Sequence, residues 1–245
     1  MMTAHVASLF EVNWQRGERQ ILNQVSFNIP QNKIVGLIGP SGSGKTSIIK
    51  VLLGMVKHDQ GEARIFNTPM PNRQILERIG YMGQTSALYE GLTAYENLIF
   101  YGQLKGYCKK ELVTRINKTL KLVDLLSHQH RIVRKFSGGM KQRLSLAMTL
   151  LSEPDFMILD EPTVGIDPKL RQTIWQQLRT MTDLGHSILM TTHVMDEAER
   201  CDEIALVMNG HIVAYGTPKA LKTQFQASTI EAVFIKAEEM NADEN

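Results

Sequence analysis

Apolar and polar residues alternate along the first 30 positions, in the runs VASLFEVNW and QILNQVSFNI. This alternation predicts two strands joined by a turn around Gly17. The run KIVGLIGPSGSGKTSIIKVLLG then predicts a short apolar strand over 33–38, a glycine-rich loop and a helix over about 44–54. Further short strands are expected at 62–66 and 79–82, so the N-terminal part should be rich in strands.

A helical spacing replaces the alternation between about residues 93 and 151, where apolar residues recur three and four positions apart. The sequence TAYE, from Thr93 to Glu96, is a capping box that opens the first helix. A second helix is expected over 109–125 and a third over 140–151. This stretch therefore predicts a block of helices inside the strand-rich chain.

Strand patterns return after the helical block, together with one more helix. The expected strands are 155–159, 186–191 and 203–208. The helix is expected over 169–183, because Asp167 and Pro168 suit a helix N-terminus. Strands and helices that alternate around an inserted helical block predict an α/β fold.

The whole chain, 1–245, is expected to form a single domain with this insertion. Its body is expected to consist of 1–84 and 154–228, with the helical subdomain at 85–153. An acidic tail follows at 229–245, and after about residue 236 it is expected to fray because it has few apolar residues.

Composition narrows the class of protein. The chain has 43% hydrophobic and 21% charged residues, which is ordinary for a globular domain, and its net charge of +2 gives no basic field for nucleic acid. Cys108 and Cys201 are far apart and are expected to be free thiols in a reducing compartment. No apolar run is long enough to cross a bilayer and no secretory signal is visible, so work at a membrane would need a partner to hold the chain there.

The glycine-rich loop carries the clearest chemistry. GPSGSGKT matches the pattern G-x-x-x-x-G-K-[ST], and it lies between an expected strand and an expected helix, as that pattern requires. Backbone N–H groups of such a loop close around phosphate oxygens, while Lys45 reaches the β- and γ-phosphates and the Thr46 hydroxyl can ligate Mg²⁺. The expected phosphate-binding residues are Gly39, Pro40, Ser41, Gly42, Ser43, Gly44, Lys45 and Thr46.

Carboxylates follow the buried strand FMILDE, at its C-terminal end. Asp160 is placed to hold Mg²⁺, and Glu161 to polarise an attacking water. His193 follows another strand and could contact a γ-phosphate, although its position alone favours a structural role. Gln84 lies where the first β/α part gives way to the helices and could touch Mg²⁺ or the water, although by itself it is only a polar loop residue.

A second glycine pair stands in KFSGGMKQRLSLAM, before an amphipathic helix. Ser137 can cap that helix, and Gly138 and Gly139 leave backbone N–H groups open to an anion. The order of P-loop, Gln84, SGG, MILDE, Asp167 and His193 resembles the ATP-binding subunit of ATP-binding-cassette (ABC) transporters. FSGGMKQRLSLA resembles the signature sequence of that family, and the resemblance extends from about residue 8 to 225.

The resemblance implies a P-loop NTPase (RecA-like) core with an N-terminal antiparallel β subdomain and an inserted α-helical subdomain. It also implies two subunits that pack head to tail, each ATP lying between one P-loop and the other subunit's signature. Ser137, Gly138 and Gly139 would then contact the partner's γ-phosphate. Glu161 would be the catalytic base and His193 the switch histidine.

Two more site residues come from the resemblance. Asp167 would meet the opposite subunit. Gln84 would link the nucleotide to the helical subdomain, beside which such subunits receive a short helix of the membrane partner.

Some positions depart from the usual family pattern. Phe136 and Met140 stand where leucine and glutamine are commonest, but FSGGM is a familiar form among exporters. Where an aromatic residue usually stacks on adenine the chain has Arg16. Trp14 shares its strand face and could reach the base, with simple sheet packing as the alternative, and Arg16 could itself stack its guanidinium.

The segments ALYEGLTAYENL and DEPTVGIDP resemble cassettes that drive efflux. The expected function is ATP hydrolysis with Mg²⁺ that powers export through a separate integral-membrane permease, at the cytoplasmic face of the cell membrane. A second cassette, expected to be an identical chain, completes the dimer, and no nucleic acid is expected to bind. The alternatives are a soluble ABC ATPase that acts on nucleic acid or ribosomes, and a non-hydrolysing regulatory cassette.

Overall fold

The structure is a computed structural model that describes residues 4–84 and 87–243. The chain forms two compact units. The first contains the residues up to Leu76 together with those from Ser187 onward, and the second contains Glu77–His186. Each unit has its own sheet strands, helices and buried apolar core.

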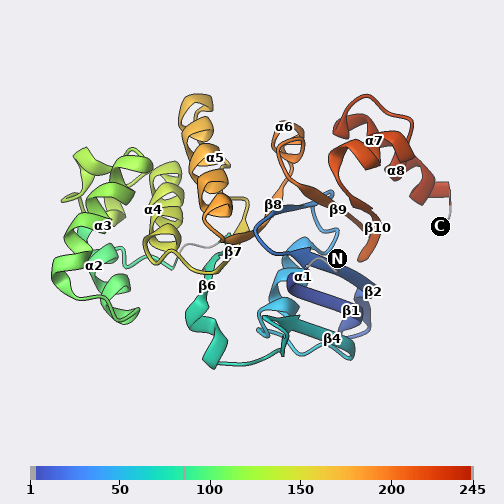
Figure 1. Cartoon of the computed structure of the whole chain (residues 1–245), viewed down its shortest axis with the longest axis horizontal. Coiled ribbons are helices and arrows are strands. Elements are labelled where there is room, and N and C mark those ends of the chain that lie inside the picture. Colours follow the sequence, from blue (N-terminus) through green and yellow to red (C-terminus); the bar gives the residue numbers. More distant parts are fainter. Residues whose placement is uncertain (1–3, 85–86, 244–245) are drawn as a thin grey trace. The chain divides into compact units, whose positions relative to one another are not determined.

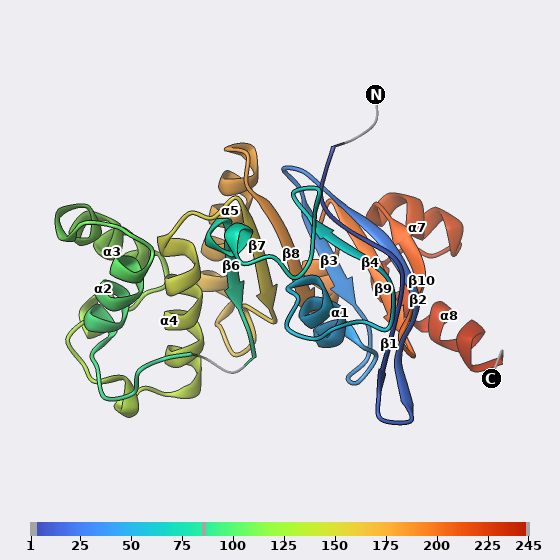
Figure 2. The ribbon, with the colours of Figure 1, turned by 90° about the horizontal axis from the view of Figure 1, so that it is seen from below.

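An antiparallel sheet opens the first unit. β1 (His5–Arg16) and β2 (Arg19–Pro30) form the hairpin predicted around Gly17, whose φ of +64° suits glycine in the turn. β4 (Gln60–Ile65) pairs with the other side of β1, and the short β5 (Thr68–Pro69) follows it. Figure 2 shows the long hairpin of β1 and β2 in blue.

A second sheet in this unit holds the buried strand of the glycine-rich loop. β3 (Ile34–Ile38) lies between β8 (Ser187–Thr192) and β9 (Glu203–Met208) and is parallel to both. All five residues of β3 are buried, as expected for a continuous apolar run in a parallel sheet. α1 (Lys45–Leu52) follows the loop, and β10 (His211–Gly216) pairs antiparallel with β9.

The C-terminal part of the first unit corrects one expectation. The chain was expected to fray after about residue 236, but α8 (Ile230–Asp243) continues as a helix, preceded by α6 (Met195–Ala198) and α7 (Pro218–Gln224). Ile230, Val233 and Ala237 recur on one helix face and are buried, which explains why the acidic segment is held. Figure 1 shows α7 and α8 in red beside the end of the chain.

The second unit contains a parallel strand pair and the predicted helices. The strands are β6 (Ile79–Met82) and β7 (Phe156–Asp160). The α-helices among its described residues are α2 (Ala94–Leu104), α3 (Lys109–Leu122), α4 (Gly138–Leu151) and α5 (Pro168–Asp183). Short 3₁₀ turns occur at Gln74–Arg78, Leu126–His128 and Val133–Lys135, the first of which spans the boundary between the units in sequence. Figure 1 shows α2, α3 and α4 together in green and yellow.

The start of α2 confirms the predicted capping box. The Thr93 hydroxyl accepts from the Glu96 backbone N–H at 3.1 Å, and the Glu96 carboxylate accepts from the Thr93 N–H at 2.8 Å. These bonds hold the pKa of Glu96 below its usual value, because they favour the ionised carboxylate.

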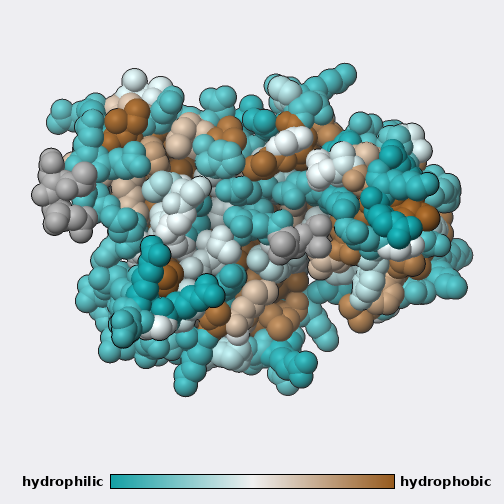
Figure 3. All heavy atoms as spheres, turned by 180° about the vertical axis from the view of Figure 1, so that it is seen from behind, coloured by the Kyte–Doolittle hydropathy of each residue, from teal (hydrophilic) through white to brown (hydrophobic). Residues whose placement is uncertain are grey.

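The surface is mostly polar on the face shown in Figure 3, where apolar patches are separated by hydrophilic side chains. Exposed large apolar residues in the second unit include Tyr89, Phe100, Leu104 and Val113. In the two described ranges, 4–84 and 87–243, the helices are too short or too polar to cross a membrane.

Candidate ATP-binding site

The phosphate loop joins β3 to α1 in the first unit. Gly42 has φ of +80° and Gly44 has φ of +111°, so both adopt left-handed backbone that favours glycine. A Cβ added at Gly39 would lie 2.1 Å from the carbonyl oxygen of Val207, which means that the loop also needs glycine for its close approach to β9. The glycines therefore set the course of the loop before any ligand binds.

Polar groups of this loop fit a phosphate. Lys45 Nζ donates to the carbonyl oxygens of Gly39 at 2.7 Å and Pro40 at 2.8 Å, so the ammonium lies over the loop. Ser43 Oγ is buried, with the residue only 4% exposed, and it has no hydrogen-bond partner among the residues that the structure describes. A buried hydroxyl without a partner is costly in a bare protein and is satisfied by a polar ligand.

The N-terminus of α1 also suits a phosphate. Its N-cap residue, Gly44, has no side chain to cap it, and its first turn contains no acidic residue. The helix dipole and the backbone N–H groups at this end favour an anion. The loop thus fits the phosphates of a nucleotide.

His193 and Trp14 also belong to the first unit. His193 is exposed and directly follows β8. Thr192 Oγ1 donates to Glu197 Oε2 at 2.7 Å and accepts from the N–H of Val194 at 3.0 Å, so the turn that carries His193 is held from both sides. Trp14 is half-buried on β1, where its register partner is Leu22.

Thr192 and Glu197 were missed by sequence reasoning. Glu197 lies in the short helix α6 and is only 1% exposed, and a carboxylate so deeply buried is normally paired. The Thr192 hydroxyl is one of its partners. The signal was weak, because an acidic residue in a segment as polar as HVMDEAER is ordinary on a surface.

The second unit holds the two adjacent carboxylates at the end of β7. Asp160 is 1% exposed. The pKa of the neighbouring Tyr81 is raised above its usual value, first because the Tyr81 side chain is partly buried and second because the Asp160 charge lies nearby. Glu161 has φ of +53°, a left-handed conformation that is uncommon for a residue with a side chain. Gln142 of α4 donates from Nε2 to the Glu161 carbonyl oxygen at 2.9 Å and so anchors this backbone.

The signature segment begins α4 in the same unit. The Ser137 hydroxyl accepts from the N–H of Met140 at 3.3 Å, which confirms that it caps the helix. Ser137 and Gly138 are exposed, and a Cβ added at Gly138 would meet no atom within 4 Å. This helix N-terminus therefore faces open space.

A glycine contact joins the signature to the loop before α5. A Cβ added at Gly139 would lie 3.3 Å from the carbonyl oxygen of Gly165. Asp167 caps α5 by accepting from the N–H of Leu170 at 3.0 Å. The Ser137–Gly139 turn and the Asp167 loop consequently lie side by side.

Gln84 is exposed just beyond β6, and the two residues after it, 85 and 86, lie outside the described ranges. The predicted site residues are thus divided between the units. One unit contains Trp14, the P-loop and His193, and the other contains Gln84, Ser137–Gly139, Asp160, Glu161 and Asp167. That a single nucleotide unites both groups stays a prediction.

Comparison with known proteins bears on these motifs. A family model described as "ABC transporter" matches residues 22–164. The chain belongs to the ABC transporter family. The P-loop, the Asp160–Glu161 pair and the signature all lie inside the matched range, so the resemblance on which they were interpreted is confirmed.

Curated relatives of this chain include two proteins that share one printed name. "Nod factor export ATP-binding protein I" of Sinorhizobium fredii is 38% identical over 216 residues, which cover 87% of this chain and 63% of that protein. The protein of the same name from Bradyrhizobium diazoefficiens is 38% identical over 208 residues, 84% of this chain and 68% of that one. The chain spans 62% to 68% of the length of these and related proteins.

Solved structures of the family confirm the α/β P-loop fold. An ATP-binding subunit of an ABC transporter superposes with a TM-score of 0.88 at 26% identity, over 95% of this chain and 99% of that one. A bacterial Atm1-family ABC exporter with ATP bound gives a TM-score of 0.82 over 95% of this chain and 42% of that one; at 21% identity it supports the fold alone. The chain therefore has the fold of the ATP-binding subunits of this family.

Proposed function

We propose that this chain powers export through a separate membrane permease by binding and hydrolysing ATP between two cassettes. The observation that carries the proposal is the second phosphate loop. Ser137 and Gly138 present a capped, solvent-facing helix N-terminus that no side chain of the described residues covers. Such a terminus suits the γ-phosphate of a nucleotide held by the P-loop of another cassette.

The roles of individual residues follow from their positions. Lys45 binds the β- and γ-phosphates, and Trp14 stacks on the base. Glu161 accepts a proton from the attacking water, and His193 contacts the γ-phosphate from the end of β8. Asp167 contacts the opposite cassette from the loop beside the signature.

Mg²⁺ neutralises phosphate charge when it is bound with the nucleotide. Thr46, Gln84 and Asp160 are the residues that would hold it. Within the described ranges no group of three or more His, Cys, Asp or Glu side chains could hold a metal ion by itself. A nucleotide magnesium usually needs only one or two protein carboxylates beside the phosphates, and the buried Asp160 suits that need.

The dimer explains how hydrolysis does work. ATP binds the closed pair better than the open one and shifts the population toward it, while loss of the γ-phosphate removes a contact to Ser137 and Gly138. Gln84 transmits this change to the helical subdomain at 85–153, next to which the permease docks. The second cassette is a copy of this chain, and the pair lies on the cytoplasmic face of the membrane.

Export as the direction of transport is supported by the relatives, whose printed names describe Nod factor export. The cargo of this chain is not carried over from them, because the cargo path lies on another polypeptide.

The proposal is tested by purifying the tagged chain from native membranes in mild detergent and measuring phosphate release with and without Mg²⁺. We expect a polytopic membrane protein in about equal amount and hydrolysis that Lys45→Ala abolishes. Recovery of the chain only in the soluble fraction with ribosomes or DNA would overturn the transport role. Unchanged hydrolysis by Lys45→Ala would overturn the P-loop assignment.

A further inference from the structure

A cavity of about 320 Å³ lies between α3, the C-terminal end of α4 and α5, all within the second unit. Its lining residues include neither the signature at the start of α4 nor the carboxylates Asp160 and Glu161 at the end of β7. Its volume is at the lower end of the range of small-molecule sites, roughly 300–1,000 Å³. None of the roles proposed above uses it.

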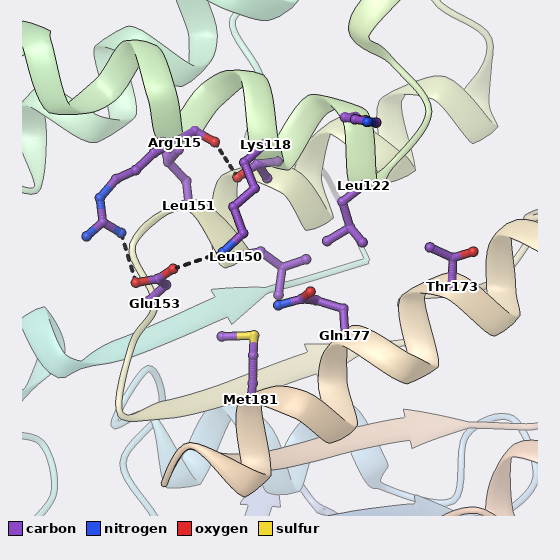
Figure 4. Close-up of a pocket in the computed structure, with 11 residues that line it drawn as sticks. Arg115, Lys118, Leu122, Leu150, Leu151, Glu153, Thr173, Gln177 and Met181 are labelled. Carbon is purple, nitrogen blue, oxygen red and sulfur yellow. Dashed lines mark hydrogen bonds and ion pairs between the residues drawn. The ribbon is translucent and has the colours of Figure 1, made fainter.

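The floor of the cavity is apolar. It is formed by Leu122 of α3, Leu150 and Leu151 of α4, and Met181 of α5. Figure 4 shows the side chains of Leu122, Gln177 and Met181 pointing into the space between α3 and α5. An apolar ligand body of compact size would remove this surface from water.

The rim on α3 is cationic. Arg115, Lys118 and Lys121 all line the cavity from that helix, and Glu153 is the one carboxylate among the lining residues. Three positive charges against one negative charge leave an excess of two positive charges. The opposite rim, on α5, offers only the uncharged polar groups of Thr173 and Gln177.

The Glu153 carboxylate forms ion pairs with two of the three cations, Arg115 and Lys118. Glu153 lies 3.0 Å from Arg115 Nη1 and 4.0 Å from Lys118 Nζ, as Figure 4 shows with dashed lines. Arg115 is further fixed over the ring of Tyr107, 4.7 Å from its centroid. Lys121 makes no ion pair among the residues that the structure describes, so the positive excess is at its end of the rim.

We propose that this cavity binds a small amphipathic anion, with its headgroup at Lys118 and Lys121 and its apolar body on Leu150 and Met181. A carboxylate and a phosphate share the required chemistry, and the test below distinguishes them. A neutral ligand would leave the cationic rim unused, and a cationic one would be repelled by it.

Because of where the cavity lies, binding of an anion is expected to slow ATP hydrolysis, an effect that rests on the proposed function. α4 begins at the signature, and Asp167 caps the start of α5. The cavity lies between α3, the C-terminal end of α4 and the middle and C-terminal part of α5. α3 and α4 belong to the helical subdomain to which Gln84 is proposed to transmit the loss of the γ-phosphate, and α5 follows β7 and the proposed base Glu161. An anion that bridges α3 and α5 fixes them to each other and slows hydrolysis.

Binding is measured first, on the whole chain and without nucleotide, by NMR of methyl-labelled methionine. Octanoate and octyl phosphate are titrated separately, with octanol and octylamine as neutral and cationic controls. We expect one or both anions to shift the Met181 methyl signal, while the signal of the exposed Met240 on α8 stays in place. If octanol or octylamine shifts Met181 as strongly as the anions do, the anionic specificity is wrong.

Variants locate the site. Lys121→Glu reverses a charge on the rim and is expected to weaken anion binding by at least about fivefold. Lys110→Glu makes the same change at an exposed position of α3 outside the cavity and should alter binding by less than about twofold. Thr173→Trp, at an exposed position of α5, fills the cavity and should abolish the Met181 shift. Equal affinities in all three variants would overturn the site.

Hydrolysis is measured next, with and without the anion that binds. We expect a slower rate in the wild-type chain and no effect on Thr173→Trp. Binding with an unchanged rate would retain the site and overturn its regulatory role. A chain that binds the anion but hydrolyses no ATP would contradict the proposed function and leave the site standing.

Discussion

Gln142 is expected to act on the reaction through the backbone of Glu161. Its amide donates to the Glu161 carbonyl oxygen at 2.9 Å, and Glu161 is held at φ of +53°. A left-handed conformation costs roughly 1–2 kcal/mol, and a hydrogen bond of this kind contributes roughly 0.5–1.5 kcal/mol. The bond is thus of the right size to offset much of the cost of the conformation.

Gln142→Met keeps the length of the side chain and removes the donor. We expect the free energy of unfolding to fall by about 1 kcal/mol, because the carbonyl loses the shorter of two hydrogen bonds and keeps the one from the N–H of Val164 at 3.4 Å. The larger effect is expected on kcat. A shift of a reacting group by about 1 Å can lower the rate roughly 100-fold, so we expect kcat to fall by about 10- to 100-fold with little change in KM.

The assay is phosphate release at saturating Mg-ATP, combined with chemical unfolding of the same preparation. Gln176→Met on α5 is the matched control, because Gln176 is exposed and its side chain is not bonded to the site. A Gln142→Met chain that is destabilised but keeps a wild-type kcat would refute the reasoning, since the contact would then be structural only.

Two further predictions concern a helix cap and the pH dependence of stability. Ser137→Ala should lose about 1 kcal/mol of stability as a helix cap and also slow hydrolysis, whereas Thr217→Ala, at the matching cap of α7, should lose similar stability and keep its kcat in the same two assays. For Glu199, burial raises the pKa, but bonds from Lys222 and the N–H of Ile230 outweigh it and hold the pKa below its usual value. Its contribution, less than about 1 kcal/mol for so exposed a pair, is present above the unfolded pKa of about 4.3 and lost as the pH falls through the lower folded pKa. Urea unfolding across that range should therefore show the wild-type chain losing its advantage over Glu199→Gln at low pH; a constant difference would contradict this.

Local signals predicted much of the fold. The capping box at Thr93 and Glu96 and the strand at 79–82 agree with the structure, because hydrogen bonding and side-chain period within a few residues determine them. β10 was missed although its signal was present. Asn209 and Gly210 have φ of +47° and +79°, the pair of left-handed residues typical of a two-residue hairpin turn.

The phosphate loops were predictable for a similar reason, since their residues are adjacent in sequence. The anchoring of Glu161 was not. Its partner Gln142 is 19 residues away, on α4, and nothing in the local sequence shows that the backbone at Glu161 is left-handed. Contacts of this kind depend on packing, which a single sequence does not display.

The central claim is that the P-loop of one cassette and the signature of another share a nucleotide. Glu161→Gln tests it most directly, because it removes the proposed base while keeping the shape of the side chain. With Mg-ATP we expect light scattering after gel filtration to show a stable dimer, and a monomer again when Lys45→Ala is added to Glu161→Gln. A strictly monomeric Glu161→Gln chain at high protein and ATP concentrations would contradict the shared site.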